Sequence, residues 1–88
     1  MGEGHRQRLF AKYSRGGIRC LCEEEIIELL LFLAIPRKDT RPTAAALIEK
    51  FGNLVGVLEA PREEFENIDG IGEHASLILS FINDLLFY

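Results

Sequence analysis

The sequence predicts an all-α fold, a compact bundle of five to six short helices. Apolar residues recur at helical spacing along most of the chain, and Gly, Pro and polar clusters of the kind that end helices lie between these segments. A length of 88 residues gives room for one core, which buries roughly 60 to 65 percent of the surface that the unfolded chain exposes. We therefore expect residues 1–88 to form a single helical domain.

The most hydrophobic segment, residues 26–35, is the expected centre of the bundle. Nine of its ten positions are apolar and only Glu28 is not, so a helix built from it should be covered on every side. A membrane span needs about 20 apolar residues, and charged residues flank this shorter segment closely, so no membrane crossing is expected. The Ile and Phe residues of this segment are also compatible with a buried strand. The leucines and the three preceding glutamates favour a helix from Glu23 to just before Pro36.

The same spacing rules predict the other helices, over residues 5–14, 42–51, 54–59, 61–67 and 73–86. Cys22 is a poor capping residue for the central helix, and Asp39 or Thr40 is the expected cap of the helix that follows it. Pro61 is expected in the first position of the helix over 61–67.

The charge distribution and the cysteine content limit the class of protein to which this chain can belong. The net charge is −4, but residues 1–20 hold five Lys or Arg against one Glu, whereas residues 61–88 hold one Arg against six acids. The first eight residues lead into no apolar stretch, so we expect no signal peptide and a cytoplasmic location. Cys20 and Cys22 are too close together for an easy disulfide and too few for an ordinary zinc site. Reduced thiols, no metal and no cofactor are expected.

Two basic patches are candidate nucleic-acid contacts. Arg8, Lys12 and Arg15 recur at i, i+4 and i+7 and so share one side of the first helix. The second patch, on the connector after the central helix, consists of Arg37, Lys38 and Arg41. Such cations either contact phosphate or form a solvated face, and the sequence leaves both open.

The local motif with the most specific content lies at about residues 61–86. Ile68, then Gly70, Ile71 and Gly72, then Ala75 follow the pattern of a helix-hairpin-helix. The glycines allow a tight turn with positive φ, Ile71 fits between the helices, and Ala75 lets them approach. The backbone N–H groups at the start of the last helix, near His74, are then free to receive a phosphate. The alternative is that the glycines serve only the turn, and the neighbouring Glu73 counts against tight binding.

GHRQRLFAKY, EIIELLLFLAIPRKDTRP, LIEKFGNLVGVL and IDGIGEHA together resemble the amino-terminal domain of RadC-type proteins, a bacterial family named for DNA repair. In that family a helix-hairpin-helix domain precedes a JAMM or MPN metallopeptidase-like domain with an HxH zinc motif. This motif is missing here, so the resemblance implies no enzyme in this chain. The resemblance does imply a hairpin at Gly70, Ile71 and Gly72, and a basic pair after the central helix, Arg37 and Lys38. A remoter similarity, to glycosylases of the endonuclease III type, fails because no Lys follows Arg62 and there is no cysteine cluster.

Two hypotheses of different class follow. In the first, the chain is a noncatalytic nucleic-acid-binding module that contacts DNA backbone without sequence specificity. In the second, it is a protein-interaction domain whose apolar residues Leu85, Leu86, Phe87 and Tyr88 dock a JAMM/MPN domain or a repair partner. Because so apolar a segment needs cover, the chain is expected to be the amino-terminal part of a longer protein.

Overall fold

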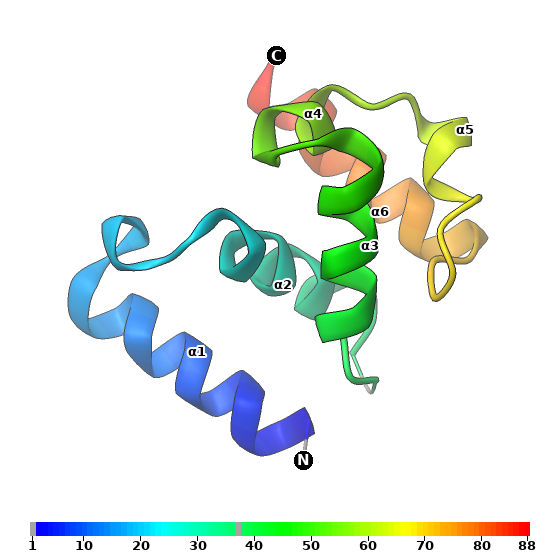
Figure 1. The fold of residues 1–88 in the computed structure, drawn as a ribbon. Coiled ribbons are helices and arrows are strands. Elements are labelled where there is room, and N and C mark those ends of the chain that lie inside the picture. Colours follow the sequence, from blue (N-terminus) through cyan, green and yellow to red (C-terminus); the bar gives the residue numbers. More distant parts are fainter. Residues whose placement is uncertain (1, 37) are drawn as a thin grey trace.

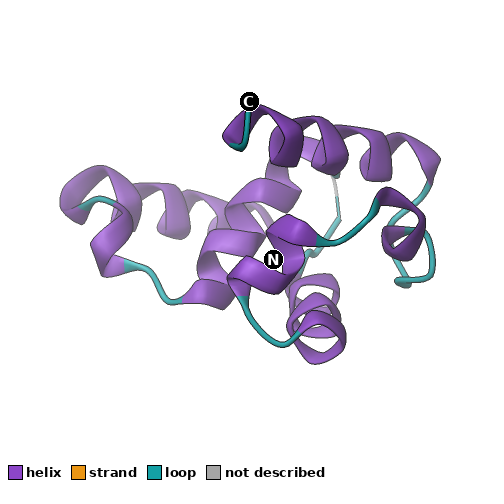
Figure 2. Ribbon diagram, turned by 90° about the horizontal axis from the view of Figure 1, so that it is seen from above, coloured by secondary structure: helices purple, strands orange, loops and turns teal. Residues whose placement is uncertain are grey.

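The computed structural model describes residues 2–36 and 38–88, and these are helical almost throughout (Figures 1 and 2). The elements in chain order are α1 (Gly2–Gly16), the 3-10 turn η1 (Ile18–Cys20), α2 (Glu23–Ala34), α3 (Arg41–Phe51), α4 (Leu54–Glu59), α5 (Arg62–Phe65) and α6 (Glu73–Leu86). No strand occurs in the described part of the chain. The predicted all-α class is confirmed, and η1 is the one helical element that the spacing did not indicate.

Helix α2 is the centre of the molecule, as its hydrophobicity predicted. It contacts α1, α3, α4 and α6. Ile27 and Leu31 on its inner side are almost fully buried and pack with Leu47 of α3 and Phe65 of α5. Phe65 also meets the ring of Phe51 edge to face, with ring centroids 5.9 Å apart. These contacts form one continuous core.

The expectation that α2 is covered on every side is wrong. The side chain of Leu33 is 67% exposed, and Leu29 and Leu30 are only half-buried. The reason lies in the number of neighbours: α1 covers the side that carries Glu28, and α3, α4 and α6 cover the side that carries Leu31. The third side of α2 faces solvent. Conversely, Glu28, the one polar residue of the segment, is only 4% exposed.

Most helix ends follow the predicted signals, but α1 spans Gly2–Gly16, where a helix over residues 5–14 was predicted. Glu25 Oε1 accepts a hydrogen bond from the Cys22 backbone N–H at 3.0 Å, so a side chain three positions on compensates for the poor cap at Cys22. Of the two candidate caps for α3, Asp39 accepts the bond, from the Arg41 backbone N–H at 3.1 Å. Helix α5 spans only Arg62–Phe65, and Pro61 precedes it instead of occupying its first turn.

Two further findings concern membranes and thiols. In residues 2–36 and 38–88, no helix combines the length and the apolarity that a membrane crossing requires. Cys20 and Cys22 are free and exposed. The Cys20 Sγ atom packs against Gly16 at the end of α1, where no larger residue would fit without moving it.

Candidate nucleic-acid interface

The turn between α5 and α6 is held from within by two buried isoleucines. The Ile68 N–H donates to the Phe65 carbonyl at 3.0 Å, and the Ile71 N–H donates to the Ile68 carbonyl at 3.1 Å. Both isoleucine side chains are less than a tenth exposed and belong to the core. Ile68 and Ile71 therefore tie the turn to the core of the molecule.

Gly70 fixes the turn against the start of α3. Its φ is +96°, a conformation that other residues rarely adopt. A Cβ at this position would lie 2.6 Å from Thr43 Oγ1, so a side chain is excluded by contact as well as by conformation. The turn is thus packed on the first turn of α3, which begins at Arg41 directly after the connector that carries Lys38.

Gly72 differs from the prediction and has a different use. Its φ is −94°, not positive, because the chain here is extended as it enters α6. It is the N-cap residue of α6 and offers no side-chain cap, and a Cβ built on it would meet nothing within 4 Å. The first intrahelical bond runs from the Ser76 N–H to the Gly72 carbonyl at 3.0 Å. The backbone N–H groups of residues 73–75, which come before Ser76, have no carbonyl in the helix to which they can donate.

The charges beside this helix start are mostly negative. Glu73, His74 and Asp69 are all exposed. Glu66 accepts a bond from the Ser76 hydroxyl at 3.4 Å and lies 4.0 Å from Arg62. The site therefore offers backbone donors and open space, but little positive side-chain charge of its own.

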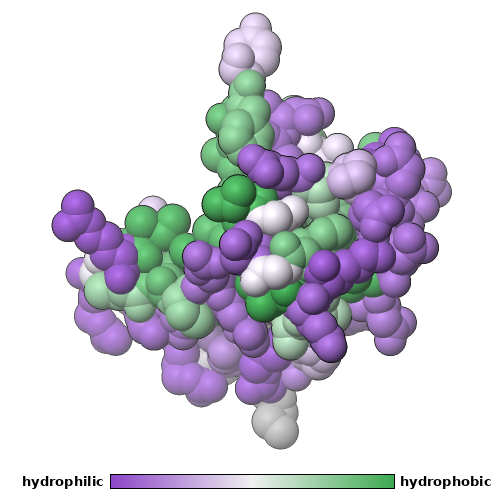
Figure 3. Space-filling view, turned by 45° about the horizontal axis from the view of Figure 1, so that its top comes forward, coloured by the Kyte–Doolittle hydropathy of each residue, from purple (hydrophilic) through white to green (hydrophobic). Residues whose placement is uncertain are grey.

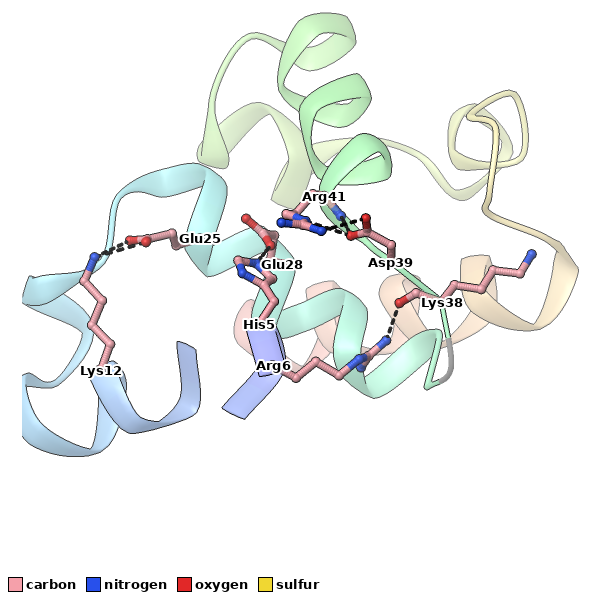
Figure 4. Close-up of polar contacts among 8 residues, drawn as sticks. All are labelled: His5, Arg6, Lys12, Glu25, Glu28, Lys38, Asp39 and Arg41. Carbon is pink, nitrogen blue, oxygen red and sulfur yellow. Dashed lines mark hydrogen bonds and ion pairs between the residues drawn. The ribbon is translucent and has the colours of Figure 1, made fainter. Parts of the chain in front are cut away.

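The connector patch is only partly available. Arg37 lies outside the described residues. Arg41 is held by Asp39, with Nε at 2.9 Å from Oδ1 and Nη2 at 3.0 Å from Oδ2. The Arg41 guanidinium and then its backbone N–H lower the pKa of Asp39 to about 2. The side chain of Lys38 is exposed and extends away from these contacts (Figure 4).

The basic stripe on α1 consists of Arg8, Lys12 and Arg15, and only part of it is available to a ligand. Lys12 Nζ pairs with Glu25, at 3.1 Å from Oε1 and 3.0 Å from Oε2. The Cys22 N–H and then Lys12 hold the pKa of Glu25 below its ordinary value. Arg8 and Arg15 are exposed. Helix α1 and the α5–α6 turn lie on opposite sides of the molecule, with α2 and α3 between them (Figure 1). The predicted contacts therefore form two separate surfaces.

The sequence reasoning missed two residues of α1 that point inward, both shown in Figure 4. Arg6 Nη2 donates to the carbonyls of Ile35 at 2.6 Å and Lys38 at 2.8 Å, and its guanidinium lies 4.3 Å from the centre of the Phe32 ring. It thereby caps the end of α2, where free carbonyls favour a cation. His5 Nε2 lies 2.5 Å from Glu28 Oε1. The available signal was their spacing from the buried Leu9, which lies three residues after Arg6 and four residues after His5.

The apolar residues predicted to dock a partner are exposed. Leu85, Leu86 and Phe87 are about three-fifths exposed, and Tyr88 is fully exposed. Figure 3 shows a partly hydrophobic projection at the top of the molecule, on the side where the carboxyl end of the chain lies in Figure 1. Leu77 and Phe81 of α6 continue this surface toward the helix start.

Comparison with known proteins finds similarity to UPF0758 proteins, the RadC family. A UPF0758 protein of Fusobacterium nucleatum subsp. nucleatum is 41% identical over 83 residues, which cover 94% of this chain and 36% of the relative. One of Ruegeria pomeroyi is 42% identical over 69 residues, which cover 78% of this chain and 31% of the relative. The chain thus spans about a third of the length of these relatives. No protein-family model and no solved structure matches it.

Proposed function

We propose that this chain is a noncatalytic nucleic-acid-binding module of a RadC-like DNA repair protein, and that it holds backbone phosphate at the start of α6. The observation that carries the proposal is Gly72. It leaves the first turn of α6 without a side-chain cap and with free space in front of it. Backbone N–H groups and the positive end of the helix dipole both favour an anion there.

The connector supports the same surface. Gly70 packs on Thr43, so the turn lies beside the start of α3, and Lys38 stands five residues before Thr43. Figure 4 shows its side chain extending toward the side of the molecule where the α5–α6 turn lies. An exposed Lys near a helix start supplies the charge that the turn itself lacks. Contacts of this kind bind the DNA backbone and carry no sequence information.

The electrostatics predict weak binding. The chain carries a net charge of −4, and Glu73 and Asp69 flank the helix start. Few phosphates are neutralised, so log K should fall with log salt with a slope of only about −1 to −2 on duplex DNA. Binding should be measurable at low salt and nearly absent at physiological salt.

The experiment is a titration of labelled duplex, branched and single-stranded DNA over a salt series with wild type, Gly72→Val and Lys38→Ala. Gly72→Val keeps an allowed φ and places its side chain in open space, where it obstructs the approach to the amides. It should lower affinity several-fold, with the melting temperature as a check on folding. Lys38→Ala should lower affinity and reduce the salt slope by about one unit.

Arg19→Ala is the matched control, because it removes one exposed positive charge from η1, far from the turn. It should change affinity less than Lys38→Ala does. Equal binding by all four proteins, or no saturable binding to any DNA at low salt, would reject the proposal.

A second candidate function has its own observation in the exposed apolar face of α6. In this reading the chain is an interaction module, and Leu85 to Tyr88 dock either a JAMM/MPN metallopeptidase-like domain or a repair partner. The matched relatives extend well beyond the region that this chain covers, so the remainder of such a relative is the first partner to test. Phe87→Asp should then abolish binding to it, while Gly72→Val leaves that binding unchanged.

A further inference from the structure

Arg6 of α1 joins two carbonyl groups of the segment that leaves α2. Its Nη2 atom donates to the Ile35 carbonyl at 2.6 Å and to the Lys38 carbonyl at 2.8 Å. These carbonyls are three residues apart in the sequence, so one guanidinium group holds the chain at two points. The backbone of Lys38 is therefore attached to α1 as well as to its own neighbours in the chain (Figure 4).

The guanidinium group of Arg6 is itself held in place. It lies 4.3 Å from the centre of the ring of Phe32, a buried residue of α2. His5, the preceding residue, pairs with the buried carboxylate of Glu28, and Leu9 is buried nearly one turn further along α1. Helix α1 thus presents Arg6 to the connector from a fixed position.

The residue after Lys38 is also fixed. Asp39 Oδ1 accepts a hydrogen bond from the Arg41 backbone N–H at 3.1 Å, which ties the connector to the start of α3. The Arg41 guanidinium pairs with the same carboxylate and offsets its negative charge. Lys38 therefore combines a held backbone with an exposed side chain, and the acid that follows it is already paired.

A held backbone matters for a phosphate contact because ordering a flexible lysine opposes binding. When the backbone is free, binding must immobilise it together with the side chain, which lowers affinity by about two- to tenfold. The contact from Arg6 orders the Lys38 backbone before any DNA arrives. This part of the entropic cost then falls on folding instead of on binding.

We propose that Arg6 is a positioning residue for the phosphate contact of Lys38, and that α1 in this way supports DNA binding without touching DNA. Arg6 is half-buried and its Nη2 atom is engaged with carbonyls, so it acts through Lys38. The role of Arg6 rests on the proposed function, because it requires that Lys38 contacts phosphate.

The test is a double-mutant cycle, in which wild type, Arg6→Ala, Lys38→Ala and the double variant are titrated with labelled duplex DNA over a salt series. Arg6→Ala should lower affinity by about two- to tenfold and leave the salt slope unchanged, because Lys38 still reaches the same phosphate. Lys38→Ala removes the contact and should reduce the slope by about one unit. Once Lys38 is replaced, Arg6→Ala should have almost no further effect on affinity.

Arg8→Ala is the matched control, because it removes an exposed guanidinium from the same helix. In the Lys38→Ala background, Arg6→Ala should change affinity no more than Arg8→Ala does. Circular dichroism at the titration temperature checks that each variant is folded. Arg6→Gln is a milder variant whose side-chain amide still donates to a carbonyl, and its affinity should lie between those of wild type and Arg6→Ala.

Nuclear magnetic resonance relaxation of the free proteins gives a readout that involves no DNA. The order parameters of the Lys38 and Asp39 amides should be about 0.85 in wild type and in Arg8→Ala, and should fall below about 0.6 in Arg6→Ala. The Asp39 amide is informative because it shares a peptide plane with the Lys38 carbonyl.

The results that overturn the role of Arg6 differ from those that overturn DNA binding itself. Equal losses from Arg6→Ala with and without Lys38 would show that Arg6 acts independently of that residue. A smaller salt slope in Arg6→Ala would mean that Arg6 contacts phosphate itself. Unchanged affinity, or connector amides that stay ordered, would leave Arg6 with a purely structural role. No saturable binding by wild type, or no effect of Lys38→Ala, would instead reject the proposed DNA contact and the role of Arg6 with it.

Discussion

His5 of α1 and Glu28 of α2 form a pair across 23 positions of sequence, with Nε2 and Oε1 2.5 Å apart. The carboxylate is 5% exposed and the imidazole 20% exposed. A buried carboxylate requires a partner, and His5 is the partner that lets a polar residue stand in the most hydrophobic segment of the chain. The pair therefore attaches α1 to the centre of the bundle.

His5→Ala should lower the free energy of unfolding by about 1 to 3 kcal/mol, because it leaves the Glu28 carboxylate buried without this partner. Partial exposure of His5 keeps the value below the loss expected of a fully buried ion pair. Urea unfolding measures it. His74→Ala, which removes an exposed imidazole from α6, is the control and should change stability by less than about 0.5 kcal/mol. Adding Glu28→Leu to His5→Ala should restore most of the loss, and no recovery would contradict this explanation.

Arg6 and Arg8 offer a comparison within one helix. Arg6 caps the carbonyls at the end of α2, whereas the side chain of Arg8 is exposed. Arg6→Ala should cost about 1 to 3 kcal/mol, since two charge-assisted hydrogen bonds are lost, and Arg8→Ala should cost less than about 0.5 kcal/mol. Thermal unfolding of both variants measures the difference. Equal losses would mean that the guanidinium contacts of Arg6 contribute no net stability.

Leu31 and Leu33 test which sides of α2 are covered. Leu31 is fully buried in the core, and Leu33 is 67% exposed on the side of α2 that faces solvent. Leu31→Ala should cost about 2 to 5 kcal/mol, and Leu33→Ala less than about 1 kcal/mol. Urea midpoints for the two variants decide the point. Leu30→Ala should lie between them, because Leu30 is half-buried at the edge of the core.

Asp39 makes the stability of the fold depend on pH in the acid range. Arg41 lowers its pKa from the ordinary 3.8 to about 2. A carboxyl whose pKa is lower in the folded chain stabilises the fold above its unfolded pKa, and this stabilisation is lost as the pH falls from about 4 to about 2. An NMR titration should place the midpoint of Asp39 near 2 in wild type and closer to 3.8 in Arg41→Ala. A wild-type midpoint near 3.8 would show that the pair does not persist in solution.

The positions of the helices could be predicted well from the sequence, but the contacts between helices could not. The bounds of α4 and α6 were predicted to the residue because apolar spacing and the adjoining turn residues lie within a few positions of each helix. The uncovered side of α2 could not be predicted, since hydropathy shows which residues avoid water but not how many neighbours the fold provides. Arg6 and Arg8 cannot be told apart in the sequence either, because hydropathy does not show which side of α1 packs against a neighbour. Only the packing of α1 on α2 separates the cation that stabilises the fold from the one left free.

The most direct test of the proposed DNA contact is a charge change at Glu73, one residue after Gly72. A carboxylate there lies within about 8 Å, a physiological Debye length, of a phosphate bound at the helix start, and it opposes binding. Glu73→Lys should tighten binding to duplex DNA several-fold at low salt and steepen the salt slope by about one unit. Glu59→Lys changes the net charge equally at the exposed end of α4 and should tighten binding much less. A titration at two salt concentrations that finds no gain for Glu73→Lys, or an equal gain for both variants, would contradict a phosphate contact at this turn.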